Sequence, residues 1–240
     1  MIDWLRQSAD PVVELPSGEL LPLALRRHPT ARRMVLRLAA DGSEARLTMP
    51  RWGRTAEALA FAQARSEWLG QQRARIPRRL TIDHGIELPW RGRPLIIDWQ
   101  AGAPRAPQVA DGRLVLGGER AAIARRVQRW LEHEVRLLLA ADLAEYAPRA
   151  GCAVPPLGLS RATRRWGSCS ARGMVRINWR LAMAPDFVRR SVAAHEVAHL
   201  VHFDHSAAFH ALLADLYEGD LTAANRWLRD HGRTLYAPFG

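Results

Sequence analysis

The residues best suited to chemistry form the segment His195-Glu196-Val197-Ala198-His199. On an α-helix, residues four apart lie on the same face, so both imidazoles can reach one metal ion. Glu196 directly follows the first histidine, points elsewhere, and is placed to take a proton from a metal-activated water molecule. The spacing therefore predicts a hydrolytic zinc site on a helix, with Glu196 as the general base.

A catalytic zinc ion usually takes three protein ligands and a water molecule, so a third ligand is expected. The candidates that follow in the sequence are His202, Asp204, His205 and His210. His202 still lies on the expected helix and points away from a tetrahedral position. His205 follows His199 by six residues, which is the spacing of the metzincin pattern, although His202 stands where that pattern has a glycine. We expect His205 to complete the set, with the chain turning back at a residue such as Asp204.

The elements that must position these residues are indicated by the hydrophobic periodicity. Before the motif we expect a long amphipathic helix over 119–148 and strands over 158–181, with a turn at 171–173. The metal-binding helix is expected from Pro185 through at least His199, and two further helices over 206–217 and 221–230.

The first half of the chain has the alternation and turn signals of strands. We expect a strand over 20–25, a hairpin of 33–38 and 45–49 around Asp41-Gly42, and one helix over 54–75. Strand-like pieces follow over 80–99, then an Ala/Pro/Gly-rich loop or domain boundary over 100–112, and a short strand over 113–116.

Three sequence segments together resemble one protein family. They are Arg165-Trp166-Gly167-Ser168-Cys169-Ser170, then Ile177-Asn178-Trp179-Arg180-Leu181 followed by Pro185, and the histidine motif with His205-Ser206 and Phe209. In order and spacing they are similar to the YgjP-like zinc metallopeptidases, which are relatives of the SprT-like and WLM proteases. The likeness is strong over about residues 151–215 and looser before them.

The resemblance implies zinc as the cofactor, with His195, His199 and His205 as ligands, Glu196 as the catalytic residue and a peptide or protein as the substrate. It also implies an α+β fold: a zincin-like catalytic domain over 113–240, with a zinc helix and a small antiparallel sheet, after an N-terminal β-rich region with one helix over 1–112. Two departures, Ser191 in place of a frequent aromatic residue and His210 in place of a frequent tryptophan, affect the expected shape of the substrate pocket.

The segment Trp166-Gly167-Ser168-Cys169 is the candidate substrate-binding strand. In zincin-like enzymes a strand beside the zinc helix pairs with extended substrate backbone, so main-chain hydrogen bonds supply affinity. Gly167 would allow close backbone approach near the metal, and Ser168 or Cys169 would line the cleft. The alternative is that Trp166 and Cys169 only pack against the helix.

Composition limits the classes of partner. The net charge is +11 and no lysine is present, so every residue of the basic excess is arginine. The arginines are scattered in pairs, which fits either solvated side chains or a surface for polyanions such as DNA or RNA.

Residues 1–10 lack the apolar core of a signal peptide, and no apolar run is long enough to span a bilayer, so a cytoplasmic protein without a membrane partner is expected. Two cysteines imply no disulfide framework.

Three alternatives to a peptidase stay open at this point. The same site would serve the hydrolysis of an amide or ester metabolite. The arginines would make the chain a nucleic-acid-associated zinc protein. A fourth protein ligand, such as Asp204 or Glu218, would make the zinc structural and leave no position for water. The sequence does not indicate an oligomeric state.

Overall fold

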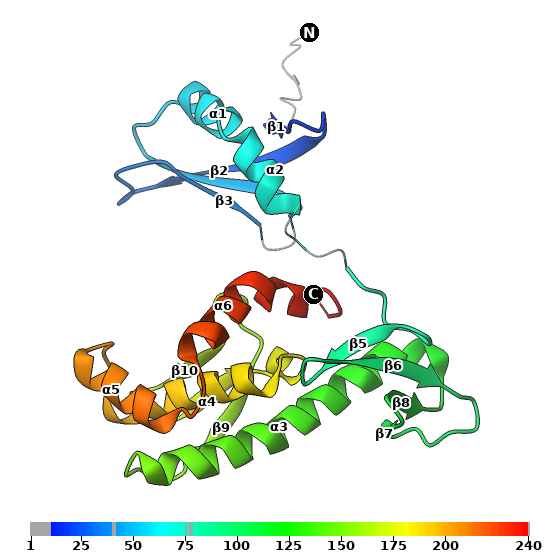
Figure 1. Cartoon of the computed structure of the whole chain (residues 1–240). Coiled ribbons are helices and arrows are strands. Elements are labelled where there is room, and N and C mark those ends of the chain that lie inside the picture. The colour runs from blue at the N-terminus through cyan, green and yellow to red at the C-terminus, as the bar shows by residue number, and fades with distance from the viewer. Residues whose placement is uncertain (1–10, 40–41, 75, 77–78, 240) are drawn as a thin grey trace. The chain divides into compact units, whose positions relative to one another are not determined.

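The computed structural model describes residues 11–39, 42–74, 76 and 79–239. The chain forms two compact units, Met1–Pro77 and Arg78–Gly240 (Figure 1). Residues 78–112, which the sequence analysis grouped with the N-terminal region, lie in the second unit. Their apolar side chains explain this grouping, because Leu88, Leu95 and Ile97 belong to the same buried cluster as the long helix and the metal-binding helix.

The first unit is a four-stranded sheet with two helices. The strands are β1 (Val12–Glu14), β2 (Leu20–His28), β3 (Val35–Leu38) and β4 (Ala45–Pro50), in the order β1-β2-β4-β3. Alternate residues, among them Leu21, Leu23 and Leu47, are buried together with apolar residues of the helices. The β3–β4 hairpin is confirmed as an antiparallel pair. Gly42 of its turn has a φ of +72°, a value that glycine adopts readily, whereas Asp41 lies outside the described residues.

The prediction of a single helix over 54–75 is wrong, because the segment forms two helices, α1 (Thr55–Gln63) and α2 (Ser66–Ala74). The amide of Arg65 bonds the carbonyl of Ala62, three residues back, which tightens the last turn of α1. The guanidinium of Arg65 also lies over the ring of Phe61, 3.6 Å from its centroid, and donates to the Phe61 carbonyl. These local contacts close one helix before the next begins.

The second unit begins with another four-stranded sheet: β5 (Glu87–Trp90), β6 (Arg93–Trp99), β7 (Gln108–Ala110) and β8 (Arg113–Leu116), in the order β5-β6-β8-β7. The tip of the β5–β6 hairpin is fastened to the segment before the metal-binding helix. The amides of Arg91 and Gly92 donate to the carbonyls of Ala182 and Met183, at 2.9 and 3.1 Å. A side chain on Gly92 would place its Cβ 2.9 Å from the Cα of Pro185, so only glycine fits this contact.

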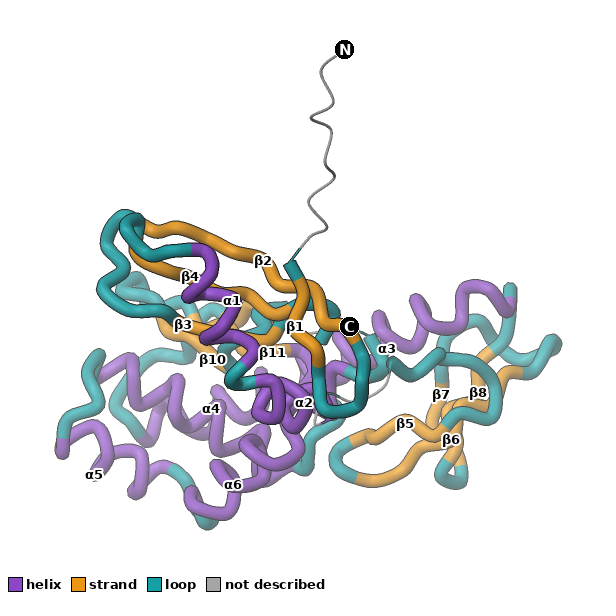
Figure 2. Tube along the Cα trace, turned by 90° about the horizontal axis from the view of Figure 1, so that it is seen from above, coloured by secondary structure: helices purple, strands orange, loops and turns teal. Residues whose placement is uncertain are grey.

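The site itself is held by one long helix, a small sheet and the helices after it (Figure 2). These elements are, in chain order, a 3₁₀ turn (Arg120–Ala122), α3 (Ile123–Arg149), β9 (Leu157–Ser160), β10 (Gly167–Cys169), β11 (Val175–Asn178), a 3₁₀ turn (Trp179–Ala182), α4 (Asp186–Val201), α5 (Ala207–Leu216), α6 (Leu221–His231) and a last 3₁₀ turn (Gly232–Tyr236). The expected helices over 119–148, 206–217 and 221–230 are confirmed to within a few residues.

The small sheet has the order β10-β11-β9 and is mixed, not purely antiparallel as expected. β10 pairs antiparallel with β11, whereas β9 pairs parallel with β11. An α+β fold is confirmed. Among the described residues no helix has the length and apolar character of a membrane span.

Candidate metal centre

Three imidazoles converge at the C-terminal end of α4. Nε2 of His195 lies 3.1 Å from Nε2 of His199 and 3.5 Å from Nε2 of His205. An ion held at about 2.0–2.1 Å in tetrahedral geometry separates its nitrogen ligands by about 3.3 Å. Within the described residues this is the one group of three or more His, Cys, Asp or Glu side chains close enough to share an ion.

The third histidine reaches the other two because the chain reverses directly after α4. The helix ends at Val201, and His202 has an extended backbone, with φ −125° and ψ 108°. Ser206 then caps α5, since its Oγ accepts the amide of Phe209 at 3.4 Å. Hydrogen bonds from Ser206 also lower the pKa of Asp204. The expected turn through Asp204 is therefore present, and it places His205 beside the helix.

Two contacts orient the rings. Nδ1 of His199 lies 3.0 Å from the carbonyl oxygen of His202, and because a carbonyl only accepts, Nδ1 carries the proton. The other ring nitrogen of His199 then presents its lone pair to an ion, as in most metal-binding histidines. The buried ring of Phe209 lies beneath the group, with its centroid 4.5–5.0 Å from those of His195, His199 and His205.

Glu196 lies against strand β10. Its side chain is 4 % exposed, and its Oε2 is buried without a hydrogen-bond partner in the described structure. Burial raises the pKa of Glu196 to about 7, and the charge of Arg165 opposes this shift. A Cβ on Gly167 would come within 2.2 Å of Oε1 of Glu196, so the strand approaches the carboxylate more closely than any other residue would permit.

Strand β10 is the outer strand of its sheet, so among the described strands none pairs with its second edge, which we call its free edge. Of the four predicted substrate-binding residues, Gly167, Ser168 and Cys169 form this strand, and Trp166 precedes it. Trp166 packs on Tyr236, with 5.8 Å between ring centroids, and its carbonyl accepts the amide of Asn178. Burial, and then the charge of Glu196, raise the pKa of the Cys169 thiol. Contact of these residues with substrate stays a prediction.

A network of charged residues, which the sequence analysis missed, ties α4 to α3. Nε and Nη2 of Arg189 donate to the two carboxylate oxygens of Asp142, at 2.7 and 3.2 Å. Both side chains are at most 5 % exposed, and Arg189 also bonds Asp186 at the start of α4. The next residue, Arg190, donates to Glu145 at 2.9 and 2.7 Å. The one signal in the sequence is that Asp142 falls on the apolar stripe of α3.

The two residues that the sequence offered as a possible fourth ligand are engaged by other groups. Glu218 accepts hydrogen bonds from Tyr146 and Arg190, and Asp204 is engaged by Ser206, so neither belongs to the histidine group. The hydroxyl of Tyr217 donates to the carbonyl of Phe187 at 2.8 Å. The guanidinium of Arg180 is buried between the rings of Trp179 and Tyr236.

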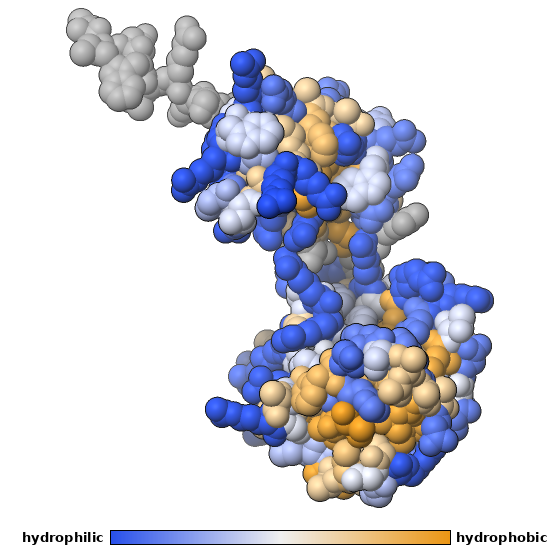
Figure 3. Space-filling model, turned by 90° about the vertical axis from the view of Figure 1, so that its left-hand side faces the viewer, coloured by the Kyte–Doolittle hydropathy of each residue, from blue (hydrophilic) through white to orange (hydrophobic). Residues whose placement is uncertain are grey.

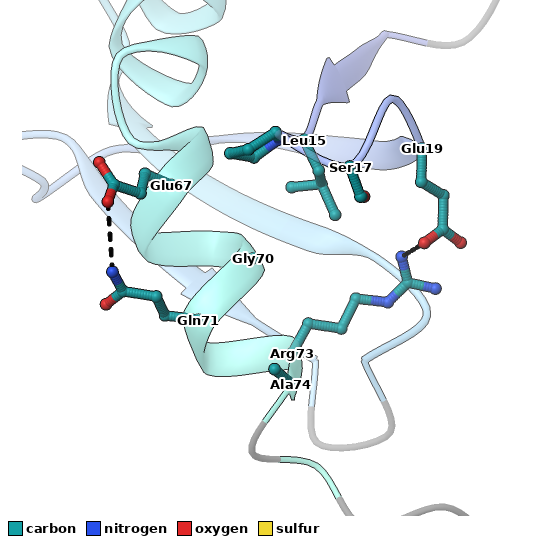
Figure 4. A pocket seen from close by; sticks show the side chains of 9 residues that line it. Leu15, Ser17, Glu19, Glu67, Gly70, Gln71, Arg73 and Ala74 are labelled. Carbon is teal, nitrogen blue, oxygen red and sulfur yellow. Dashed lines mark hydrogen bonds and ion pairs between the residues drawn. The ribbon is translucent and has the colours of Figure 1, made fainter.

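Two surface pockets lie apart from the histidines. One, of about 540 Å³, lies between the β1–β2 turn and α2, where Arg73 pairs with Glu19 (Figure 4). The other, of about 560 Å³, lies over the β5–β6 hairpin and the first residues of α4. Neither is lined by a histidine of the metal centre or by Glu196.

Comparison with known proteins was consistent with this site. Residues 32–231 match the family described as YgjP-like, metallopeptidase domain, a region that contains the three histidines, Glu196 and strand β10. No curated protein and no solved structure matched the chain. Because the family match covers most of the sequence, the chain belongs to the YgjP-like metallopeptidase family.

Proposed function

We propose that this protein is a zinc-dependent peptidase, with His195, His199 and His205 as the metal ligands. The observation that carries the proposal is the convergence of three imidazole nitrogens, 3.1 and 3.5 Å apart, with a buried carboxylate on the same helix. The donor set fits zinc, which favours nitrogen ligands in tetrahedral sites and keeps a position open when it is catalytic. No fourth protein ligand joins the group among the described residues.

The residues divide the chemistry between them. When bound, a zinc ion supplies Lewis acidity toward water and toward the scissile carbonyl. Glu196 accepts the proton of the attacking water and returns it to the leaving amine, which suits a carboxylate that lies on the same helix as two of the ligands. Its Oε2 has no hydrogen-bond partner in the described structure, so no other group competes for its lone pairs.

Substrate would bind as an added strand on the free edge of β10. Strand addition uses backbone hydrogen bonds and therefore suits an extended peptide of varied sequence. Gly167 supports this geometry, because it brings the backbone of the edge strand to the side chain of Glu196. The peptide bond to be cleaved would thus lie between the strand edge and the proton acceptor.

Two measurements test the proposal. Metal analysis of the purified protein should give one zinc ion, lost on His205→Ala. Glu196→Gln should keep zinc and abolish cleavage of a peptide library, whereas Glu87→Gln, an exposed residue of β5, should behave as the unchanged protein. A Glu196→Gln variant with full activity would refute the general-base role. Cleavage of small amides or esters alone, with no peptide cleaved, would refute the peptidase assignment.

A further inference from the structure

One end of the sheet in the first unit collects unpaired positive charge. β2 and β4 run parallel, so His28 and Pro50 end side by side, and the loops that leave these strands emerge at the same end. Five arginines lie there, and we call them the basic end: Arg26, Arg32, Arg33, Arg51 and Arg54. All five are exposed, and no ion pair among the described residues includes them.

An exposed tryptophan projects from the same end. Trp52 is 78 % exposed, more than any other large apolar side chain of the described ranges. It is part of a tight turn, because the amide of Gly53 bonds the carbonyl of Pro50 at 3.1 Å. Gly53 is itself buried, and a Cβ there would meet Met49 at 2.9 Å. The turn is packed against the sheet, and its indole is directed outward.

Arg27 holds this turn in place. Its guanidinium donates to the carbonyls of Arg51 and Gly53 and to the hydroxyl of Thr55, the last at 3.0 Å. Arg27 therefore serves as a clamp, and the five arginines of the basic end stay available to a ligand. An indole that is already held in place loses little conformational freedom when a ligand binds. It therefore stacks on a ligand more favourably than a loosely held ring would.

We propose that the basic end, with Trp52, binds single-stranded nucleic acid. Arginines neutralise the phosphates, and the indole face stacks on a base. Charge complementarity is carried by the five arginines of the basic end, which are exposed and belong to no ion pair among the described residues. An acidic peptide would satisfy the arginines but leave the indole without a stacking partner. An anionic membrane would require a larger apolar surface than one side chain. Figure 3 shows that hydrophilic side chains project over much of this unit.

The test is the binding of a labelled oligothymidylate of about 15 nucleotides to the full chain, followed by fluorescence anisotropy at about 50–200 mM salt. Three to five phosphate contacts predict a slope of log K against log salt of about −2 to −3.5. Trp52→Ala should weaken binding about 5- to 150-fold with the slope unchanged. Trp52→Phe, which keeps a stacking ring, should stay closer to the unchanged protein.

Arg26→Gln with Arg33→Gln should reduce the size of the slope by about 1.4. The matched control is Arg125→Gln with Arg129→Gln, two exposed arginines of α3, which should leave the slope unchanged. Equal effects of the two pairs, unchanged binding in Trp52→Ala, or binding of polyglutamate or anionic vesicles in place of the oligonucleotide would each overturn the proposal. The assay measures binding only, so its outcome is independent of the peptidase activity.

Discussion

Removal of the Asp142 carboxylate should destabilise the second unit more than removal of any exposed acid. Asp142→Ala leaves Arg189 buried with Asp186 as its remaining ion-pair partner among the described residues, and the Asp186 side chain is 36 % exposed. Breaking a buried ion pair on one side costs about 3–5 kcal/mol, since the other charge stays desolvated, and the partly exposed Asp186 compensates it only in part. We expect a loss in this range.

Glu145→Ala is the matched control, because Glu145 is on the same helix and also pairs with an arginine of α4. Its side chain is 46 % exposed, and Arg190 keeps Glu218, so its loss should cost at most about 1 kcal/mol. Urea denaturation followed by circular dichroism at constant metal content separates the two. With a slope of about 1–3 kcal/mol per molar urea, a loss of about 3–5 kcal/mol in Asp142→Ala should lower the midpoint by about 1–5 M. Equal midpoints for the two variants would refute the reasoning.

Three further predictions follow from the site. Gly167→Ala should keep zinc and lower hydrolysis about 100-fold, because Glu196 must move to avoid a Cβ at 2.2 Å; unchanged kcat would contradict this. Metal titration of His202→Ala should give an unchanged zinc affinity, since the backbone carbonyl orients the ligand ring, whereas His205→Ala should weaken it. Hydrogen bonds from Arg190, the backbone and Tyr146 lower the pKa of Glu218 from 4.5 to about 2, although burial opposes this shift. The ionised Glu218 therefore stabilises the fold above pH 4.5, and this contribution is lost as the pH falls to 2. Glu218→Gln should flatten that part of a curve of stability against pH.

The positions of the three histidines were predictable from the sequence, because they depend on the spacing and types of neighbouring residues. His195 and His199 share a helix face because residues four apart always do. His205 needed only a short reversal, which Asp204 and Ser206 indicate by their residue types. The β3–β4 hairpin and α3 were predictable for the same reason, since periodicity and turn residues act over a few positions.

What could not be predicted depends on contacts distant in sequence. The pairing of Asp142 with Arg189 joins residues 47 positions apart. The close approach of Gly167 to Glu196 was suggested only in general terms, and its partner is visible only in the fold. Likewise, nothing local shows that β5–β8 share the core of α3, because an alternating strand is equally compatible with either unit.

The β5–β6 hairpin has a consequence for where the metal-binding helix starts. Arg91 bonds Asp186, the first residue of α4, across 95 residues of sequence, and the backbone of the hairpin tip bonds the segment just before it. A chain shortened to begin at residue 113 would keep all three histidines and Glu196, yet α4 would lose its fixed origin. The distances of His195 and His199 from that origin are set by the helical rise, so a hairpin without any metal ligand determines where these two imidazoles lie.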